Sequence, residues 1–187
     1  MKHLGTKTLE SQRLILRAFE RSDAEAMFKN WAGDEEVTRF LSWPAHQSVR
    51  ASEAVLGAWV SRYGDERAYQ WAIVPKELGE PIGSIAAVKV KDEIAAVEIG
   101  YCIGRNWWRQ GIASEALAAL LRFFFEEVGV NRVEARHDLQ NPNSGKVMQK
   151  CGMRLEGTLR QGGRNNRGIV DTALYARLAE EYFKGPE

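Results

Sequence analysis

The residues best suited to chemistry lie near the middle of the chain, between Glu98 and Ala116. This segment reads as a strand, a turn, a loop that contains Gly111 and the start of a helix. A glycine and small residues at the start of a helix let several backbone N–H groups converge on an anion, and the helix dipole adds partial positive charge. The pattern suits a pyrophosphate, but it also fits a tight turn that merely begins a helix.

Two common nucleotide-binding motifs are absent from the sequence. A P-loop needs Gly-x-x-x-x-Gly-Lys-Ser/Thr, and neither Gly111 nor Gly145 has those partners. The dinucleotide fingerprint Gly-x-Gly-x-x-Gly is missing as well. These absences argue against nucleotide hydrolysis, so the rest of the chain must decide which anion the loop serves.

The elements that position this loop begin with an N-terminal strand. Apolar and basic residues alternate over residues 13–18, which predicts a half-buried strand with Leu14 and Leu16 inward. Ser22 and Glu25 are spaced as a capping box, in which each side chain satisfies a backbone N–H of a new helix. The first helix is therefore expected to begin at this point.

A second helix and a set of strands follow the first helix, which is expected to end near Ala32. Apolar residues at helical spacing predict the second helix from Ser48 to Tyr63. Turn-like segments then separate three predicted strands, at residues 69–74, 82–90 and 95–103. Their short connections predict an antiparallel meander that leads into the loop at Gly111.

The C-terminal half alternates helices and strands. A long amphipathic helix is expected from Ala113 to Val128, with Gly129 placed to end it. A strand is expected from Arg132 to His137, and a final pair of strands is joined by a loop from Gly162 to Gly168. The expected limits of that pair are residues 154–160 and 169–176.

A short helix is predicted between those strands by its end signals. Asn141 is expected as the N-cap, Pro142 occupies the first helical position, and Gly152 follows the last turn. With no internal repeat or low-complexity tract, the chain is read as one domain covering residues 1–187.

Segments 98–116 and 141–157 together resemble the GCN5-related N-acetyltransferase (GNAT) family, closest to its ribosomal-protein-alanine acetyltransferase branch. The resemblance runs nearly end to end, from residues 13–17 to residues 171–175. It implies an α/β (α+β) fold with a single mixed, mostly antiparallel, seven-stranded sheet flanked by helices. It also implies acetyl-CoA as co-substrate, with the sheet splayed at the acyl-CoA site and pantetheine lying in the gap.

The same resemblance implies which residues hold acetyl-CoA. Trp108 stands where the wider family usually has Gln or Arg, and the branch often has Trp there. Met148 replaces the tyrosine that often acts as the acid in the wider family. The implied CoA-binding residues are Tyr101, Cys102, Ile103, Trp108, Arg109, Gln110, Gly111, Ile112, Ala113, Ser114, Asn141, Ser144 and Lys146.

Acetyl transfer to an amine requires a neutral amine, a polarised thioester carbonyl and a proton for the departing thiolate. Glu98 is the candidate base, acting directly or through water, although a salt-bridged strand carboxylate is an equal reading. His137, at the end of the neighbouring strand, is the next candidate. Backbone N–H groups from Tyr101 to Ile103 are suited to stabilise the oxyanion.

Ser144 is the candidate acid, because its hydroxyl lies in the first turn of a short helix and falls on the branch's serine position. A serine that only bonds to local backbone is the common alternative. Cys102 is disfavoured as a nucleophile because no histidine is predicted beside it, and Cys151 is expected to pack. Direct transfer is therefore preferred to an acyl-enzyme.

Two further groups of side chains have no assigned role. The aromatic loop with Phe40 and Trp43, preceded by Trp31, is expected either to line the acceptor pocket or to pack as core and lid. The final hairpin carries three arginines that suit either an acidic protein surface or solvent. They are Arg160, Arg164 and Arg167.

The composition of the chain limits the classes of partner that it can bind. Lys plus Arg number 26 and Asp plus Glu 25, so the net charge of +1 supports neither a nucleic-acid nor a membrane-surface partner. No apolar run reaches the roughly 18 residues of a membrane span, and the N-terminus lacks a secretory signal, so a cytoplasmic location is expected. Two cysteines and three histidines form no metal-ligand or disulfide pattern, so no metal is expected.

Taken with the resemblance, these features predict an N-acetyltransferase that moves an acetyl group from acetyl-CoA to a primary amine. The expected acceptor is the N-terminal α-amine of a protein such as a ribosomal protein. A small-molecule amine (an antibiotic, a polyamine or an amino acid) is the alternative acceptor, and a non-catalytic CoA-binding module is the alternative class. A homodimer is left open.

Overall fold

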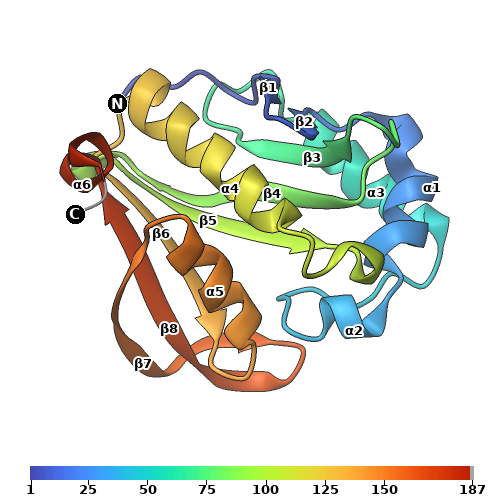
Figure 1. Cartoon of the computed structure of the whole chain (residues 1–187). Helices are drawn as coiled ribbons and strands as arrows, with labels where there is room; N and C mark the ends of the chain where they lie inside the picture. The colour runs from blue at the N-terminus through green and yellow to red at the C-terminus, as the bar shows by residue number, and fades with distance from the viewer. Residues whose placement is uncertain (186–187) are drawn as a thin grey trace.

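The computed structural model describes residues 1–185, which form one mixed sheet with helices on both faces (Figure 1). The strand order is β1-β2-β3-β4-β5-β6-β8-β7. All neighbouring strands pair antiparallel except β5 and β6, which are parallel. The strands are β1 Leu9–Glu10, β2 Leu14–Arg17, β3 Gln70–Pro75, β4 Gly83–Lys91, β5 Ala96–Ile103, β6 Arg132–Asp138, β7 Arg154–Asn165 and β8 Gly168–Leu178.

The helices lie between the strands and after the last one. Two of them continue into a π-helical turn, at Phe28–Ala32 after α1 and at Phe123–Val128 after α4. The α-helices are α1 Ala24–Met27, α2 Glu35–Thr38, α3 Val49–Val60, α4 Ile112–Arg122, α5 Pro142–Lys150 and α6 Ala179–Lys184. None of the helices within residues 1–185 has the length and apolar character needed to cross a membrane.

The predicted fold class is confirmed, with one strand more than expected. The two-residue β1 pairs with β2 at the edge of the sheet, which makes eight strands in residues 1–185 where seven were predicted. Such a short strand has too few residues for an alternating pattern, so only its pairing with β2 identifies it. The meander of β3, β4 and β5 is confirmed, and Gly129 ends the long helix with a φ of 73°.

The predicted capping box at Ser22 is wrong. The chain enters a 3-10 turn one residue earlier, and the backbone N–H of Glu20 donates to Asp23 at 2.8 Å. Asp23 is buried and held by Arg17 through two contacts of 2.8 Å. This buried ion pair therefore sets the start of the helix, and the hydroxyl of Ser22 only contacts the Glu20 side chain.

The predicted loop from Gly162 to Gly168 is also wrong. Strands β7 and β8 continue into it, with pairs Gly163 to Val170 and Asn165 to Gly168, so only a two-residue turn remains. Gly168 makes the tight turn possible with a φ of +100°. An irregular register between Leu159 and Gly163 accommodates the other glycines.

Two hydrophobic cores lie on opposite faces of the sheet. The larger packs α4 and α5 against inward residues of the strands, including Val97, Ile99 and Ala135. The smaller packs the first helices against the other face around Trp31 and Leu56. Because strand residues alternate between faces, each strand presents one set of side chains to α4 and α5 and the other set to the opposite face.

Candidate functional site

The candidate site is built around the place where β5 and β6 separate. The two strands pair in parallel from Ala96 and Arg132 as far as Ile99 and Ala135. Both strands then continue, to Ile103 and Asp138, without pairing to each other. One backbone edge of β5 is therefore free of a partner strand over its last residues, as the splayed sheet predicted from the resemblance requires.

The loop after β5 has the shape of an anion site at the start of α4. Arg109 and Gly111 adopt left-handed φ angles of 61° and 77°, and α4 begins at Ile112. The indole N–H of Trp108 donates to the carbonyl of Ile103 at 2.8 Å, which folds the loop back against the end of β5. The first N–H groups of a helix have no partner within the helix, so they are available to a phosphate.

Two cations from distant segments stand beside this loop. A Cβ placed on Gly111 would lie 3.6 Å from Nη2 of Arg13 and 3.7 Å from Nζ of Lys150. Arg13 is held by Glu115 at 2.7 Å and donates to the carbonyl of Gln110 at 3.1 Å. The sequence pattern did not identify Arg13 or Lys150 as site residues, because no local spacing connects Gly111 with residues that are 98 and 39 positions away from it.

The start of α5 faces the same gap. Asn141 occupies the predicted N-cap position, but its side chain caps no backbone N–H. Its amide instead donates to the hydroxyl of Ser144 at 3.0 Å. Close packing supports this placement, since a Cβ on Gly145 would lie 2.6 Å from Nε2 of His137 on β6.

The remaining predicted CoA-loop residues mostly support the helix. Ile112 and Ser114 are buried, and Ala113 packs against the larger core. The carbonyl of Ser114 accepts a hydrogen bond from the thiol of Cys151 at 3.2 Å. Lys146 is exposed on α5. In the first turn of α4, the backbone rather than the side chains is therefore the part open to a ligand.

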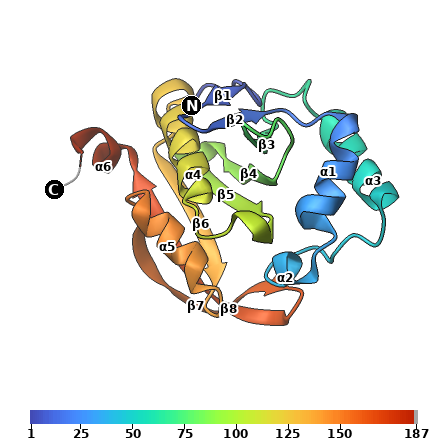
Figure 2. The same ribbon diagram turned by 45° about the vertical axis from the view of Figure 1, so that its right-hand side comes forward.

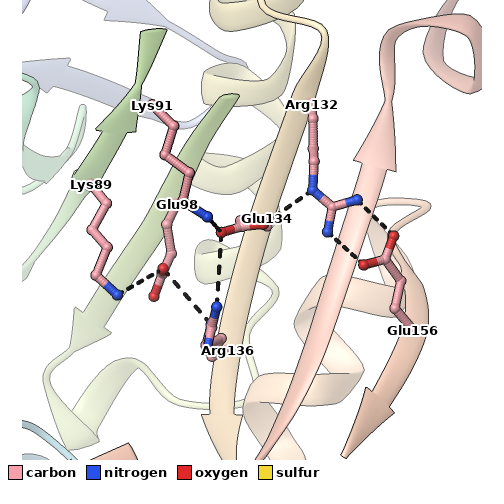
Figure 3. Close-up of polar contacts among 7 residues, drawn as sticks. All are labelled: Lys89, Lys91, Glu98, Arg132, Glu134, Arg136 and Glu156. Atoms are coloured by element: carbon pink, nitrogen blue, oxygen red, sulfur yellow. Dashed lines mark hydrogen bonds and ion pairs between the residues drawn. The ribbon is translucent and has the colours of Figure 1, made fainter. Parts of the chain in front are cut away.

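Glu98 lies in a network of ion pairs on the face opposite α4 and α5 (Figure 3). Its carboxylate is 3.1 Å from Lys89 and 3.7 Å from Arg136, and the residue is 8% exposed. The neighbouring Glu134 is paired with Lys91 and with Arg132. This is the salt-bridged arrangement considered as the alternative for Glu98, and a role as base stays a prediction.

His137 and Cys102 occupy separate environments. His137 lies on the α5 side of β6, with Nδ1 2.8 Å from the carbonyl oxygen of Asp138. Cys102 lies on the other side, 3.4 Å from the hydroxyl of Ser84, and burial raises the pKa of its thiol. A protonated thiol is a poor nucleophile, which agrees with direct transfer.

Candidate acid and candidate base therefore lie on opposite faces of the sheet. Ser144 belongs to α5, which covers one face, whereas Glu98 and Asp138 point to the other. Strands β5 and β6, which lie between the two faces, stop pairing after Ile99 and Ala135.

The aromatic residues before α3 divide between the two predicted roles. Trp31 is fully buried in the smaller core, so it packs rather than lines a pocket. Phe40 is partly buried, with Arg39 and Arg167 over its ring at 5.4 Å and 5.8 Å from its centre. Arg167 is also 3.0 Å from Asp138, so this arginine is not simply solvated.

The chain is similar to known proteins over nearly its whole length. Residues 13–154 match the family model described as an acetyltransferase (GNAT) domain. The chain is 30% identical to an uncharacterized N-acetyltransferase p20 of Bacillus licheniformis, over 94% of this chain and 98% of the relative. It is also 30% identical to the ribosomal-protein-serine acetyltransferase of Escherichia coli, again over 94% and 98%.

A solved structure supports the fold independently. The crystal structure of a GNAT-family acetyltransferase from Bacillus anthracis superposes with a TM-score of 0.82 at 26% identity. The match covers 94% of this chain and all of the other.

Proposed function

The chain belongs to the GNAT acetyltransferase family, and we propose that it acetylates the N-terminal α-amine of a protein. Its reaction class is acetyl-CoA-dependent N-acetyl transfer, as in the rest of the family. We further propose that residues 1–187 act as one domain, since the family model spans most of the sheet.

One observation carries the proposal: the gap between β5 and β6 has Ser144 on one face and carboxylates on the other. The α4 N-terminus, with Arg13 and Lys150 beside Gly111, is suited to the pyrophosphate of acetyl-CoA. Pantetheine then extends from there along the gap, which places the thioester between the two faces.

The roles of the side chains follow from this placement. Glu98, directly or through water, takes the proton that the ammonium must lose before its nitrogen attacks the thioester carbon. The unpaired edge of β5 donates N–H groups to the oxyanion. When the tetrahedral intermediate collapses, its nitrogen releases a second proton to solvent and the carbon–sulfur bond breaks. Ser144 gives its hydroxyl proton to the departing thiolate and regains a proton from solvent. The N-acetylated acceptor and free CoA are the products.

The acceptor class is supported by likeness to a protein-modifying relative. The Escherichia coli relative is named for acetylation of a ribosomal protein, and the match extends over nearly the full length of both chains. A protein N-terminus is a slender extended chain, so its amine can reach a gap in a sheet without a large opening.

The test is release of free CoA thiol with a panel of amines, followed by mass spectrometry of the product. Peptides with free N-termini are compared with the same peptides blocked at the α-amine but carrying a free lysine, and with small amines. We expect only the free N-terminal peptides to be acetylated. Equal acetylation of blocked peptides, or turnover with small amines alone, would contradict the α-amine assignment.

A further inference from the structure

The turn of the β7–β8 hairpin is bound to the segment between α2 and α3, here called the acceptor loop (residues 39–47). The backbone N–H of Asn166 donates to the carbonyl of Leu41 at 3.1 Å. Its side-chain amide donates to the carbonyls of Thr38 at 2.8 Å and Trp43 at 2.7 Å. Figure 2 shows the hairpin reaching beneath α2, as Figure 1 does from another side. These hydrogen bonds hold the hairpin turn and the acceptor loop together.

The same turn is bound to the end of β6. Oδ2 of Asp138 accepts from the side-chain amide of Asn165 at 2.8 Å and from Arg167 at 3.0 Å. Asp138 is three residues beyond Ala135, where pairing between β5 and β6 ends. At about 3.3 Å per residue, the hairpin anchor lies roughly 10 Å from the start of the gap. The hairpin turn and the acceptor loop therefore lie beside the face from which the amine approaches.

A cavity of about 540 Å³ lies between the hairpin and the acceptor loop. It is polar, and its lining comes from both segments: Ser42, Arg164, Asn165, Asn166 and Gly168. The bonds of Asn166 hold these two sides in place, so the cavity does not depend on a single flexible side chain.

Arg164 is the charged group of this cavity that is left unpaired. Within residues 1–185 its guanidinium has neither an ion pair nor a hydrogen bond, whereas the nearby Arg167 is paired with Asp138. A guanidinium stays charged at every physiological pH and offers a planar pair of donors that matches a carboxylate. The cavity thus presents a permanently charged, unpaired guanidinium beside the acceptor path.

We propose that this cavity is a subsite for a carboxylate of the acceptor, bound by Arg164 a few residues beyond the reacting amine. The proposal rests on the proposed function and names its substrate class: protein N-termini with an acidic residue near the amine. An extended chain covers about 3.3 to 3.6 Å per residue, so a separation of roughly 10 Å corresponds to about the third to fifth residue.

The experiment compares the kinetics of matched hexapeptides with free N-termini. Each is an alanine peptide that begins with serine and carries Asp or Asn at the third, fourth or fifth position. For wild type we expect one Asp peptide to have a KM about tenfold below that of its Asn partner, the scale of one charge-assisted hydrogen bond. Arg164→Ala should abolish this preference without changing the KM for acetyl-CoA, and Arg164→Glu should reverse it.

Arg160→Ala is the matched control, because Arg160 is an exposed arginine of the same strand that does not line the cavity. This variant should keep the preference for the Asp peptide. Acetylation of all peptides without a preference, or a preference that survives Arg164→Ala, overturns the subsite alone. If wild type acetylates no peptide but does acetylate small amines, the proposed function fails and the subsite falls with it.

Discussion

The phenol of Tyr101 on β5 donates a 2.9 Å hydrogen bond to the backbone carbonyl of Ser144 on α5. Burial raises the pKa of Tyr101, so the phenol stays a donor throughout the physiological range. Together with the Asn141 amide at 3.0 Å from the Ser144 hydroxyl, this bond places the candidate acid over the gap between β5 and β6.

Ser144→Ala should lower turnover by about tenfold or more while leaving acetyl-CoA affinity nearly unchanged, because the hydroxyl is needed only when the thiolate departs. Steady-state kinetics and a direct acetyl-CoA binding measurement separate the two effects. Asn143→Ala, an exposed change in the same helical turn, is the control and should behave as wild type. Unchanged turnover in Ser144→Ala would remove this serine as the acid.

Gly111→Glu should abolish the stabilisation that acetyl-CoA gives to the folded protein. Gly111 has a φ of +77°, and the new carboxylate would stand beside Arg13 and Lys150, where an anion is expected to bind. A ligand at 100 times its Kd stabilises by about 2.7 kcal/mol, which a thermal-shift assay detects. Gly129→Glu is matched in backbone strain, with a φ of +73° and open space around it, and should keep the full ligand response.

Glu98→Gln should slow acetyl transfer about 100-fold near neutral pH and recover part of the rate as pH rises, if this carboxylate accepts the ammonium proton. At high pH the solution itself supplies neutral amine. The measurement is a rate-versus-pH series at saturating acetyl-CoA. Lys89→Met is the control, because it breaks the 3.1 Å ion pair but leaves the carboxylate. Equal losses in both variants, without recovery at high pH, would make Glu98 structural.

Asp138→Asn should remove a contribution to stability that depends on pH. Burial opposes the charged form of Asp138, but hydrogen bonds from Gln140 and Asn165 and the charge of Arg167 outweigh it and lower the pKa of this carboxyl. Since the folded pKa lies below the unfolded value of about 3.9, the contribution is complete above that pH and is lost as pH falls through the folded pKa.

The corresponding measurement is urea unfolding between pH 3 and pH 8. The difference in unfolding free energy between wild type and Asp138→Asn should be constant from pH 6 to pH 8 and should shrink below about pH 4. Glu53→Gln removes one exposed charge from α3 and controls for the change in net charge. A difference in unfolding free energy that does not vary with pH would show that this side chain acts only through its shape and not through its charge.

Asn166→Ala should raise the KM for the acceptor several-fold and leave the KM for acetyl-CoA unchanged. The substitution removes one hydrogen bond to Thr38 at the end of α2 and one to Trp43 in the acceptor loop, but none near Gly111. Asn166→Asp should be at least as damaging, because it turns a carboxylate toward the carbonyls of Thr38 and Trp43. Parallel changes in both KM values would mean that the hairpin supports the whole fold rather than the acceptor side.

Local patterns determined most of the secondary structure. The alternation of apolar and basic residues predicted β2 with Leu14 and Leu16 buried. Pro142 at the start and Gly152 just after the end of the helix predicted the position of α5. The same reasoning misplaced the helix start at Ser22 and read a loop where β7 and β8 continue. Both errors arise where a partner outside the local motif overrides it: Arg17, six residues before Asp23, holds that carboxylate, and residues 168–170 of β8 pair with residues 163–165.

The family, the fold class and the loop at Gly111 could be predicted from the sequence, because they depend on the types and the order of residues along the chain. Three contacts became visible only in the folded chain: the ion pairs of Glu98 with Lys89 and Arg136, the approach of Arg13 and Lys150 to Gly111, and the bond from Asn166 to the acceptor loop. These contacts join residues from 9 to 123 positions apart. Such pairs are set by strand register and by the packing of helices on the sheet, and no local spacing encodes them.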